Sequence, residues 1–240
     1  MQKSNARRFI EAYNQIDYAL RIQHNFKRSM GYSDMIRRAV AVNYIVRKYE
    51  EDLIDYGRLR NAIIHRSSDE YLIAEPHDDV VAEMEKISKL ICTPPKVLEV
   101  LAPHDVLTVQ YDVSLKKVVE LISTSKYSNI PVYKDGTLVG VANGQKLLNL
   151  IGKKIAENVD ISTYISNTTI EEAVKQFPTE TKYFEMASSD VSIDEVLNLF
   201  NQNRKLLMVL ITKTGSMQEV PLGIVTGTDI IDLNAVLENY

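Results

Sequence analysis

Residues Asp190-Val-Ser-Ile-Asp-Glu-Val-Leu-Asn-Leu-Phe200 decide the fold, because they repeat Asp112-Val-Ser-Leu-Lys-Lys-Val-Val-Glu-Leu-Ile122 at an offset of 78 residues. A second match follows each copy, Leu138-Val-Gly-Val-Ala142 in the first and Leu222-Gly-Ile-Val225 in the second. The second match has an offset near 83, because the second hairpin is longer, and two matches in the same order indicate a repeated structural unit. The sequence therefore predicts a tandem repeat, with a first copy at about 104–152 and a second at about 183–237.

Each copy is expected to follow the order strand, helix, strand, strand, helix. Asp135-Gly136 predicts the hairpin turn of the first copy, since a tight turn needs residues that tolerate positive φ. The second hairpin, around Lys213–Glu219, is longer. Residues 160–182 belong to neither copy and are interpreted as a connection with a short helix at Thr169–Phe177. In the first copy the predicted strands are 106–109, 129–133 and 137–141, and the predicted helices are 114–122 and 145–151.

The chain before the repeats has helical periodicity instead. Phe9, Tyr13, Ile16 and Leu20 recur at spacings of four, three and four, which is one face of an amphipathic helix. Thr93-Pro94-Pro95 ends the helical pattern by removing donors and restricting the backbone. The predicted fold class is therefore α+β, an all-α four-helix bundle at 1–92 followed by an α/β repeat pair at 97–240. The predicted helices are about 5–25, 33–47, 51–65 and 76–92.

Composition excludes several classes of protein. With 45% apolar and 25% charged residues, the chain is typical of a globular protein rather than a disordered one. The longest apolar run, Leu206–Ile211, is too short to cross a bilayer, and no signal peptide is recognisable, so we expect a cytoplasmic protein without membrane contact. The single cysteine, Cys92, excludes an internal disulfide, and we expect no metal site.

The net charge of −4 hides an uneven distribution. Residues 1–66 contain 13 basic and seven acidic side chains, a net charge of about +6, and the rest of the chain carries about −10. The front of the chain could therefore attract a polyanion that the rest would repel.

The stretch Gly223-Ile-Val-Thr-Gly-Thr-Asp229 fits the pattern of glycine, two apolar residues, Thr or Ser, any two residues and Asp. With this motif, residues 97–240 resemble a pair of CBS domains, named after cystathionine β-synthase. The resemblance implies a regulatory adenosine nucleotide as ligand and predicts a site at Gly223, Thr226, Thr228 and Asp229. AMP, ATP, a cyclic dinucleotide and S-adenosylmethionine share the adenosine half and stay open, and no further cofactor is expected.

The spacing of this motif suits a ribose. A carboxylate one helical turn after a Thr hydroxyl can accept hydrogen bonds from two vicinal hydroxyls, while free N–H groups at the helix start face the phosphate. The alternative is a capping box, in which Thr226 and Asp229 stabilise the helix start without a ligand.

A phosphate needs a cation. Aligning the repeats with Pro131 opposite Val209 makes Arg204 the counterpart of Lys126, at a position where the CBS resemblance implies a phosphate contact. We therefore predict Arg204, assisted by Lys205, as the phosphate ligand, with a solvated helix end as the alternative.

The first copy departs from the motif. Asn143 stands at the Thr position and Lys146 at the Asp position, so one site per chain is expected, and Lys146 could instead meet a phosphate of the ligand held by the second copy.

The stretch Leu59-Arg-Asn-Ala-Ile-Ile-His65 has the spacing R-N-x-x-x-H. Together with the helical pattern, it is similar to HEPN domains, many of which are metal-independent ribonucleases. The resemblance implies a homodimer that joins two copies of Arg60, Asn61 and His65 in one RNA cleft, with His65 as general acid or base. The alternative is an ion-pairing Arg60, a helix-ending His65 and a bundle that only dimerises or binds a partner. The leading hypothesis is thus a nucleotide-controlled endoribonuclease, and the alternative is a non-catalytic nucleotide sensor.

Overall fold

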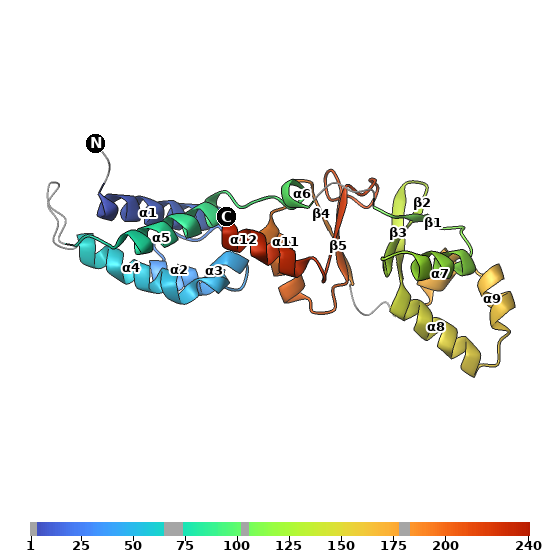
Figure 1. The fold of residues 1–240 in the computed structure, drawn as a ribbon. Helices are drawn as coiled ribbons and strands as arrows, with labels where there is room; N and C mark the ends of the chain where they lie inside the picture. The colour runs from blue at the N-terminus through green and yellow to red at the C-terminus, as the bar shows by residue number, and fades with distance from the viewer. Residues whose placement is uncertain (1–3, 65–73, 102–105, 178–182) are drawn as a thin grey trace. The chain divides into compact units, whose positions relative to one another are not determined.

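The computed structural model describes residues 4–64, 74–101, 106–177 and 183–240, which form helices and short strands of the α+β class (Figure 1). They form two compact units. The helical unit comprises Met1–Val100, Ser192–Asn201 and Ile231–Tyr240, and the sheet unit comprises Leu101–Val191 and Gln202–Ile230. The helices of the first are α1 Asn5–Gln23, α2 Tyr32–Ala39, α3 Tyr44–Lys48, α4 Glu50–Ile64, α5 Asp78–Cys92, α6 Val97–Val100, α11 Ile193–Gln202 and α12 Ile230–Asn239, of which α11 and α12 extend one residue into the sheet unit.

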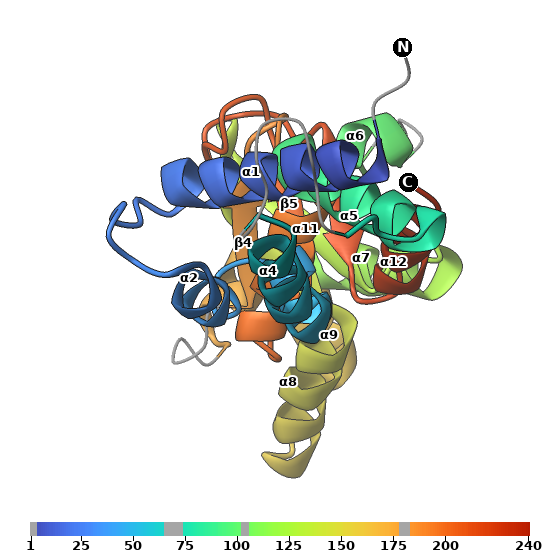
Figure 2. The same cartoon turned by 90° about the vertical axis from the view of Figure 1, so that its left-hand side faces the viewer.

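Helices α1 and α5 pack against each other in the helical unit. The two helices run in the same direction, because Arg8 near the start of α1 pairs with Glu85 at 2.6 Å, and Gln23 at its end donates to the carbonyl of Ile91. Phe9 of α1 is fully buried, as the sequence periodicity predicts. The helices α2 and α4 pack together below α1 in the view of Figure 2.

The second predicted helix is two helices in the structure, which corrects the expectation of one helix from Ser33 to Arg47. Helix α2 ends at Ala39, and α3 begins after Asn43. The buried Asn43 adopts an extended backbone and its side chain accepts a hydrogen bond from the N–H of Val46, so it caps a new helix. The described part of residues 1–92 therefore contains five helices.

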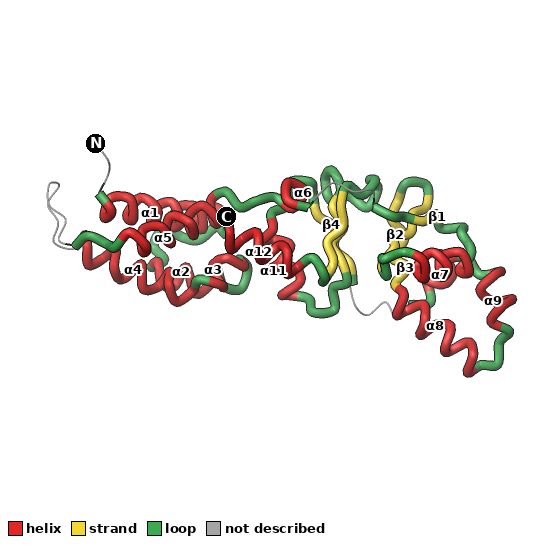
Figure 3. The backbone as a smooth tube through the Cα atoms, viewed as in Figure 1, coloured by secondary structure: helices red, strands yellow, loops and turns green. Residues whose placement is uncertain are grey.

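The described part of the sheet unit contains two three-stranded sheets with the same topology (Figure 3, yellow). In each, the first strand is parallel to the second, and the second is antiparallel to the third. The sequence repeat thus corresponds to a repeated strand order. The strands are β1 Val109–Gln110, β2 Asn129–Lys134, β3 Thr137–Asn143, β4 Phe184–Ala187, β5 Met208–Ile211 and β6 Gly223–Thr226.

Two local expectations have different outcomes. The predicted hairpin turn is confirmed, since Asp135 and Gly136 have φ values of 48° and 79°. The predicted strand at 106–109 is wrong in extent, because ladder pairing involves only Val109 and Gln110.

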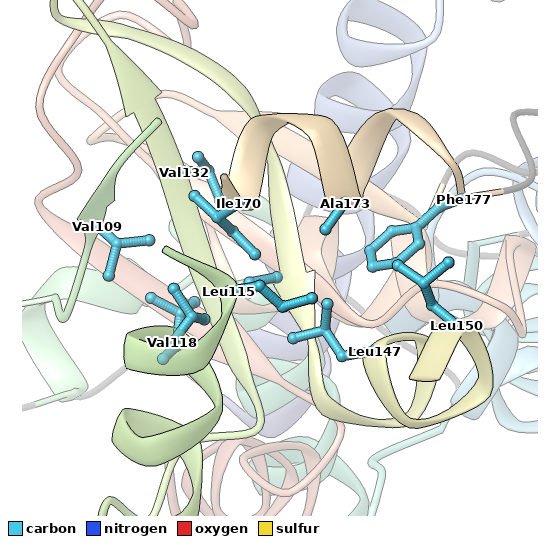
Figure 4. Packing of buried hydrophobic residues seen from close by; sticks show 11 residues of the cluster. Val109, Leu115, Val118, Val132, Leu147, Leu150, Ile170, Ala173 and Phe177 are labelled. Carbon is cyan, nitrogen blue, oxygen red and sulfur yellow. The ribbon is translucent and has the colours of Figure 1, made fainter. Parts of the chain in front are cut away.

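Helices cover one side of the first sheet and form its core (Figure 4). The predicted helix in the connection is confirmed as α10, and its Ile170 and Ala173 pack into this core. A second apolar cluster joins the two sheets and includes Val141 of β3 and Leu210 of β5. The helices of this unit are α7 Leu115–Thr124, α8 Gly144–Ala156, α9 Ile161–Asn167 and α10 Ile170–Lys175.

Candidate functional site

The predicted ribose site lies where β6 turns into α12. Oδ2 of Asp229 accepts two hydrogen bonds from Thr226, one from its backbone N–H at 2.7 Å and one from its hydroxyl at 2.8 Å. Thr226 Oγ1 also lies 2.8 Å from the hydroxyl of Thr228. The carboxylate therefore stabilises the turn, as in half of the capping box. Among the described residues no hydrogen bond reaches Oδ1 of Asp229, so this oxygen can accept from a ligand.

A cavity of about 480 Å³ opens at this junction, within the size range of small-molecule sites. Its charged lining side chains, among the described residues, are Lys126 and Asp229. Hydroxyl and amide groups stand beside them, and aliphatic side chains supply an apolar wall. The lining residues are Leu101, Lys126, Tyr127, Ser128, Asn129, Leu206, Leu207, Ile224, Thr226, Gly227, Thr228 and Asp229.

Three of the predicted nucleotide-binding residues, Thr226, Thr228 and Asp229, line this cavity together. Gly223 is buried at the start of β6 and does not line it. Arg204 and Lys205 do not line it either, although Leu206 and Leu207 directly after them do.

Among the residues that the structure describes, the cation that lines the cavity is Lys126, and strand register explains why the alignment pointed to Arg204 instead. The motif positions Asn143 and Thr226 pair with Asn129 and Met208, so these two residues are equivalent. Counting back three residues makes Lys126 the counterpart of Lys205, which corrects the pairing with Arg204. Tyr127, Ser128 and Asn129 were not predicted, although their place at the start of a repeat strand was a usable signal.

The equivalent junction of the first repeat, between β3 and α8, is occupied by the protein's own side chains. Asn143 accepts a hydrogen bond from the N–H of Lys146 at 2.9 Å and donates to Asn129 at 2.7 Å. Nζ of Lys146 lies 3.3 Å from the ring centroid of Tyr183 and 5.5 Å from that of Phe177. Burial lowers the pKa of Lys146. Lys146 does not line the cavity, in contrast to the idea that it meets a phosphate there.

These observations can be set beside known proteins. Residues 98–153 match the family model of the CBS domain. This stretch runs from α6 into α8 and covers the first repeat, whereas the cavity also takes residues from the second repeat, including the Thr226–Asp229 motif.

Several solved structures of CBS domains are similar to the chain. A CBS domain protein from Streptococcus pneumoniae is 19% identical, with 59% of this chain and 84% of that chain covered and a TM-score of 0.43. The CBS domain of a bacterial CNNM/CorC family Mg²⁺ transporter, solved with ATP, is 21% identical over 63% and 94% of the chains, with a TM-score of 0.44. CBSX2, solved with AMP, is 18% identical over 60% and 98%, with a TM-score of 0.43. A comparison with curated proteins finds no match.

The predicted catalytic residues of the helical unit are described only in part. His65 lies outside the described residues. Arg60 donates to Oδ1 of Asn61 at 3.3 Å, so these two predicted residues are in contact. The guanidinium of Arg60 also lies 5.1 Å from the ring centroid of Tyr13, and its Nε is buried without a hydrogen-bond partner among the described residues. Burial raises the pKa of Tyr13 to about 12 against the opposing charge of Arg60. Arg60 therefore packs within its own unit.

The described residues contain no cluster of three or more metal-ligating side chains. None of the helices found in them has the length and apolarity needed to span a membrane.

Proposed function

We propose that this chain is a nucleotide-sensing regulatory protein in which residues 97–240 act as a tandem CBS pair. The observation that carries the proposal is the cavity, where the motif carboxylate, the two motif hydroxyls of Thr226 and Thr228, a lysine and an apolar wall face one space. The match of residues 98–153 to the CBS family supports the identity of the first repeat. The second repeat is assigned to the same family because its sheet has the same topology.

The ribose, phosphate and base of an adenosine nucleotide can each be matched to residues that line this cavity. Oδ1 of Asp229 is available for a ribose hydroxyl, and Oδ2 becomes available when Thr226 releases it. Lys126 and the hydroxyl of Thr228 suit a phosphate, because charge-assisted hydrogen bonds are the strongest available to it. Leu206, Leu207 and Ile224 supply an apolar surface for a base. We therefore propose AMP or ATP, with a cyclic dinucleotide as the other ligand to be compared.

The first experiment is calorimetry on the full chain with AMP, 2′-deoxy-AMP, ATP and cyclic di-AMP, after mass spectrometry of any nucleotide that co-purifies. We expect saturable binding of AMP or ATP. The 2′-deoxy analogue should bind more weakly by about tenfold or more, because a hydrogen bond to a charged group contributes about 1.5–3 kcal/mol. Absence of binding for all four ligands would contradict the proposed function. Equal affinity for AMP and its 2′-deoxy analogue would contradict the ribose placement alone.

For the activity that the nucleotide would regulate, we propose that the HEPN-like helical unit acts as a homodimer and cuts RNA. The contact of Arg60 with Asn61 and the charge of about +6 on residues 1–66 favour this proposal. The packing of Arg60 on Tyr13 favours the alternative, in which the unit only dimerises or binds a partner. Incubation of the full chain with RNA, with and without each nucleotide, separates them: ribonuclease activity should disappear in His65→Ala, and no cleavage under any ligand would leave the alternative.

A further inference from the structure

Helix α12 connects the motif of the cavity to the helical unit within one continuous element. It begins at Ile230, directly after Asp229, and runs to Asn239. Its residues from Ile231 onward belong to the helical unit. Leu233 and Leu237, one turn apart, are 0% and 1% exposed, so this part of the helix is firmly packed.

Polar contacts attach α12 to α3. The hydroxyl of Tyr44 donates to Oδ1 of Asn234 at 2.6 Å. One turn further along both helices, Nζ of Lys48 pairs with Glu238 at 3.2 Å. These contacts fix the register of α12 against α3, since both partners of each pair lie on helices.

A second set of contacts attaches the end of α12 to α5. Nζ of Lys89 donates to the carbonyl of Tyr240 at 3.2 Å and lies 3.9 Å from the centroid of its ring. The hydroxyl of Tyr240 donates to the carbonyl of Thr93, the residue that caps α5, at 3.1 Å. Lys86 of α5 donates to the carbonyl of Glu238. The residues that follow the nucleotide motif are therefore bound to α3 and α5 at several points.

Ligand binding is expected to change the hydrogen bonds directly before α12. Oδ2 of Asp229 accepts from both the N–H and the hydroxyl of Thr226. A ribose whose two hydroxyls use both carboxylate oxygens must compete with these hydrogen bonds. A ligand shifts a conformational equilibrium only when it interacts differently with the two states, and this competition supplies the difference.

We propose that α12 transmits nucleotide occupancy from Asp229 to α3 and α5, through the ion pair of Glu238 with Lys48 and the contacts of Tyr240. The inference rests on the proposed function and adds the route of its regulation. Coupling free energies are reciprocal. If nucleotide binding shifts the packing equilibrium of α12 on α3 and α5 by a given factor, this packing changes the nucleotide affinity by the same factor.

The test is hydrogen exchange measured by mass spectrometry on the full chain, with and without saturating AMP, and with ATP in a parallel series. Nucleotide should change exchange in peptides covering α3 and α5 by threefold or more, because local opening depends on the packing of these helices. In Lys48→Ala/Tyr240→Ala this response should be lost, while calorimetry still detects nucleotide binding.

The matched control is Asn198→Ala in α11. Asn198 accepts from Arg47 at 2.9 Å and donates to the carbonyl of Val42, so the variant also breaks contacts between a repeat helix and the N-terminal helices. No described residue of α11 lines the cavity, and the response of α3 and α5 should persist in this variant. Nucleotide binding without any response in the unsubstituted chain would overturn the inference alone. A response that survives in Lys48→Ala/Tyr240→Ala would do the same, whereas absence of binding would overturn the proposed function and the inference together.

Discussion

The two strand-to-helix junctions of the sheet unit share a topology and use opposite hydrogen-bond polarity. At β3–α8 the residue that ends the strand is the acceptor, since Asn143 receives the N–H of Lys146. At β6–α12 the residue three positions later is the acceptor, since Asp229 receives the N–H of Thr226. Either arrangement gives a hydrogen-bond partner to a backbone N–H of the strand-to-helix junction. Only the second places a carboxylate in the cavity.

The side chains at the seventh and last motif position, Lys146 and Asp229, differ in their surroundings. The ammonium group of Lys146 contacts the rings of Tyr183 and Phe177, and burial there lowers its pKa. Asp229 stays partly exposed at the cavity wall. The fold thus accommodates a lysine or an aspartate at this position, and only the aspartate supplies a carboxylate to the cavity.

The largest expected effect comes from removing the carboxylate. Asp229→Ala should weaken AMP or ATP binding by more than tenfold, because a lost charge-assisted contact costs about 1.5–3 kcal/mol. The matched variant Lys146→Ala in the first repeat should change affinity by less than twofold. Calorimetry on both variants measures the contrast, with circular dichroism as the control for folding. Similar losses in the two variants would mean that both junctions contribute to one site.

Gly140, the first residue of the motif in the first repeat, allows a test of stability. A Cβ at Gly140 would lie 2.4 Å from Cγ1 of Val174, just after the core residue Ala173 in α10. Gly140→Ala should therefore destabilise the protein by about 1–3 kcal/mol through overpacking, measured as the free energy of unfolding in urea. In a Val174→Ala background the same substitution should cost less. An equal cost in both backgrounds would show that the close approach to α10 does not explain this glycine.

The surroundings of Gly140 also separate the features that the sequence predicts from those that it does not predict. Periodicity predicted α1 and the strand order of the repeats, because these patterns are local and follow the helical and strand periods. The same reasoning predicted a helix in the connection but not its packing against β3, which depends on a long-range fit between Gly140 and Val174. The break between α2 and α3 was missed, since the cap at Asn43 is a single buried side chain.

The candidate site was predictable to a similar degree. Thr226, Thr228 and Asp229 follow from a contiguous motif and line the cavity together. The predicted phosphate ligand, Arg204, is not among the residues that line the cavity. The connection before β5 is one residue longer than the one before β2, since β5 begins six residues after α11 ends and β2 begins five after α7 ends. An alignment at the constant offset of the helices therefore paired Lys126 with Arg204.

The smallest expected effect tests this correction directly. Lys126 and Arg204 are both exposed, but only Lys126 lines the cavity. Lys126→Ala should weaken AMP binding by about three- to tenfold, less than the loss of Asp229, because the lysine contact is more solvated. Adenosine has no phosphate, so its affinity should not change in this variant, and Arg204→Ala should leave both affinities unchanged. Calorimetry with AMP and adenosine on the two variants gives all four values. A loss of AMP affinity in Arg204→Ala alone would restore the phosphate ligand expected from sequence, and it would require Arg204 to reach a ligand from outside the cavity lining.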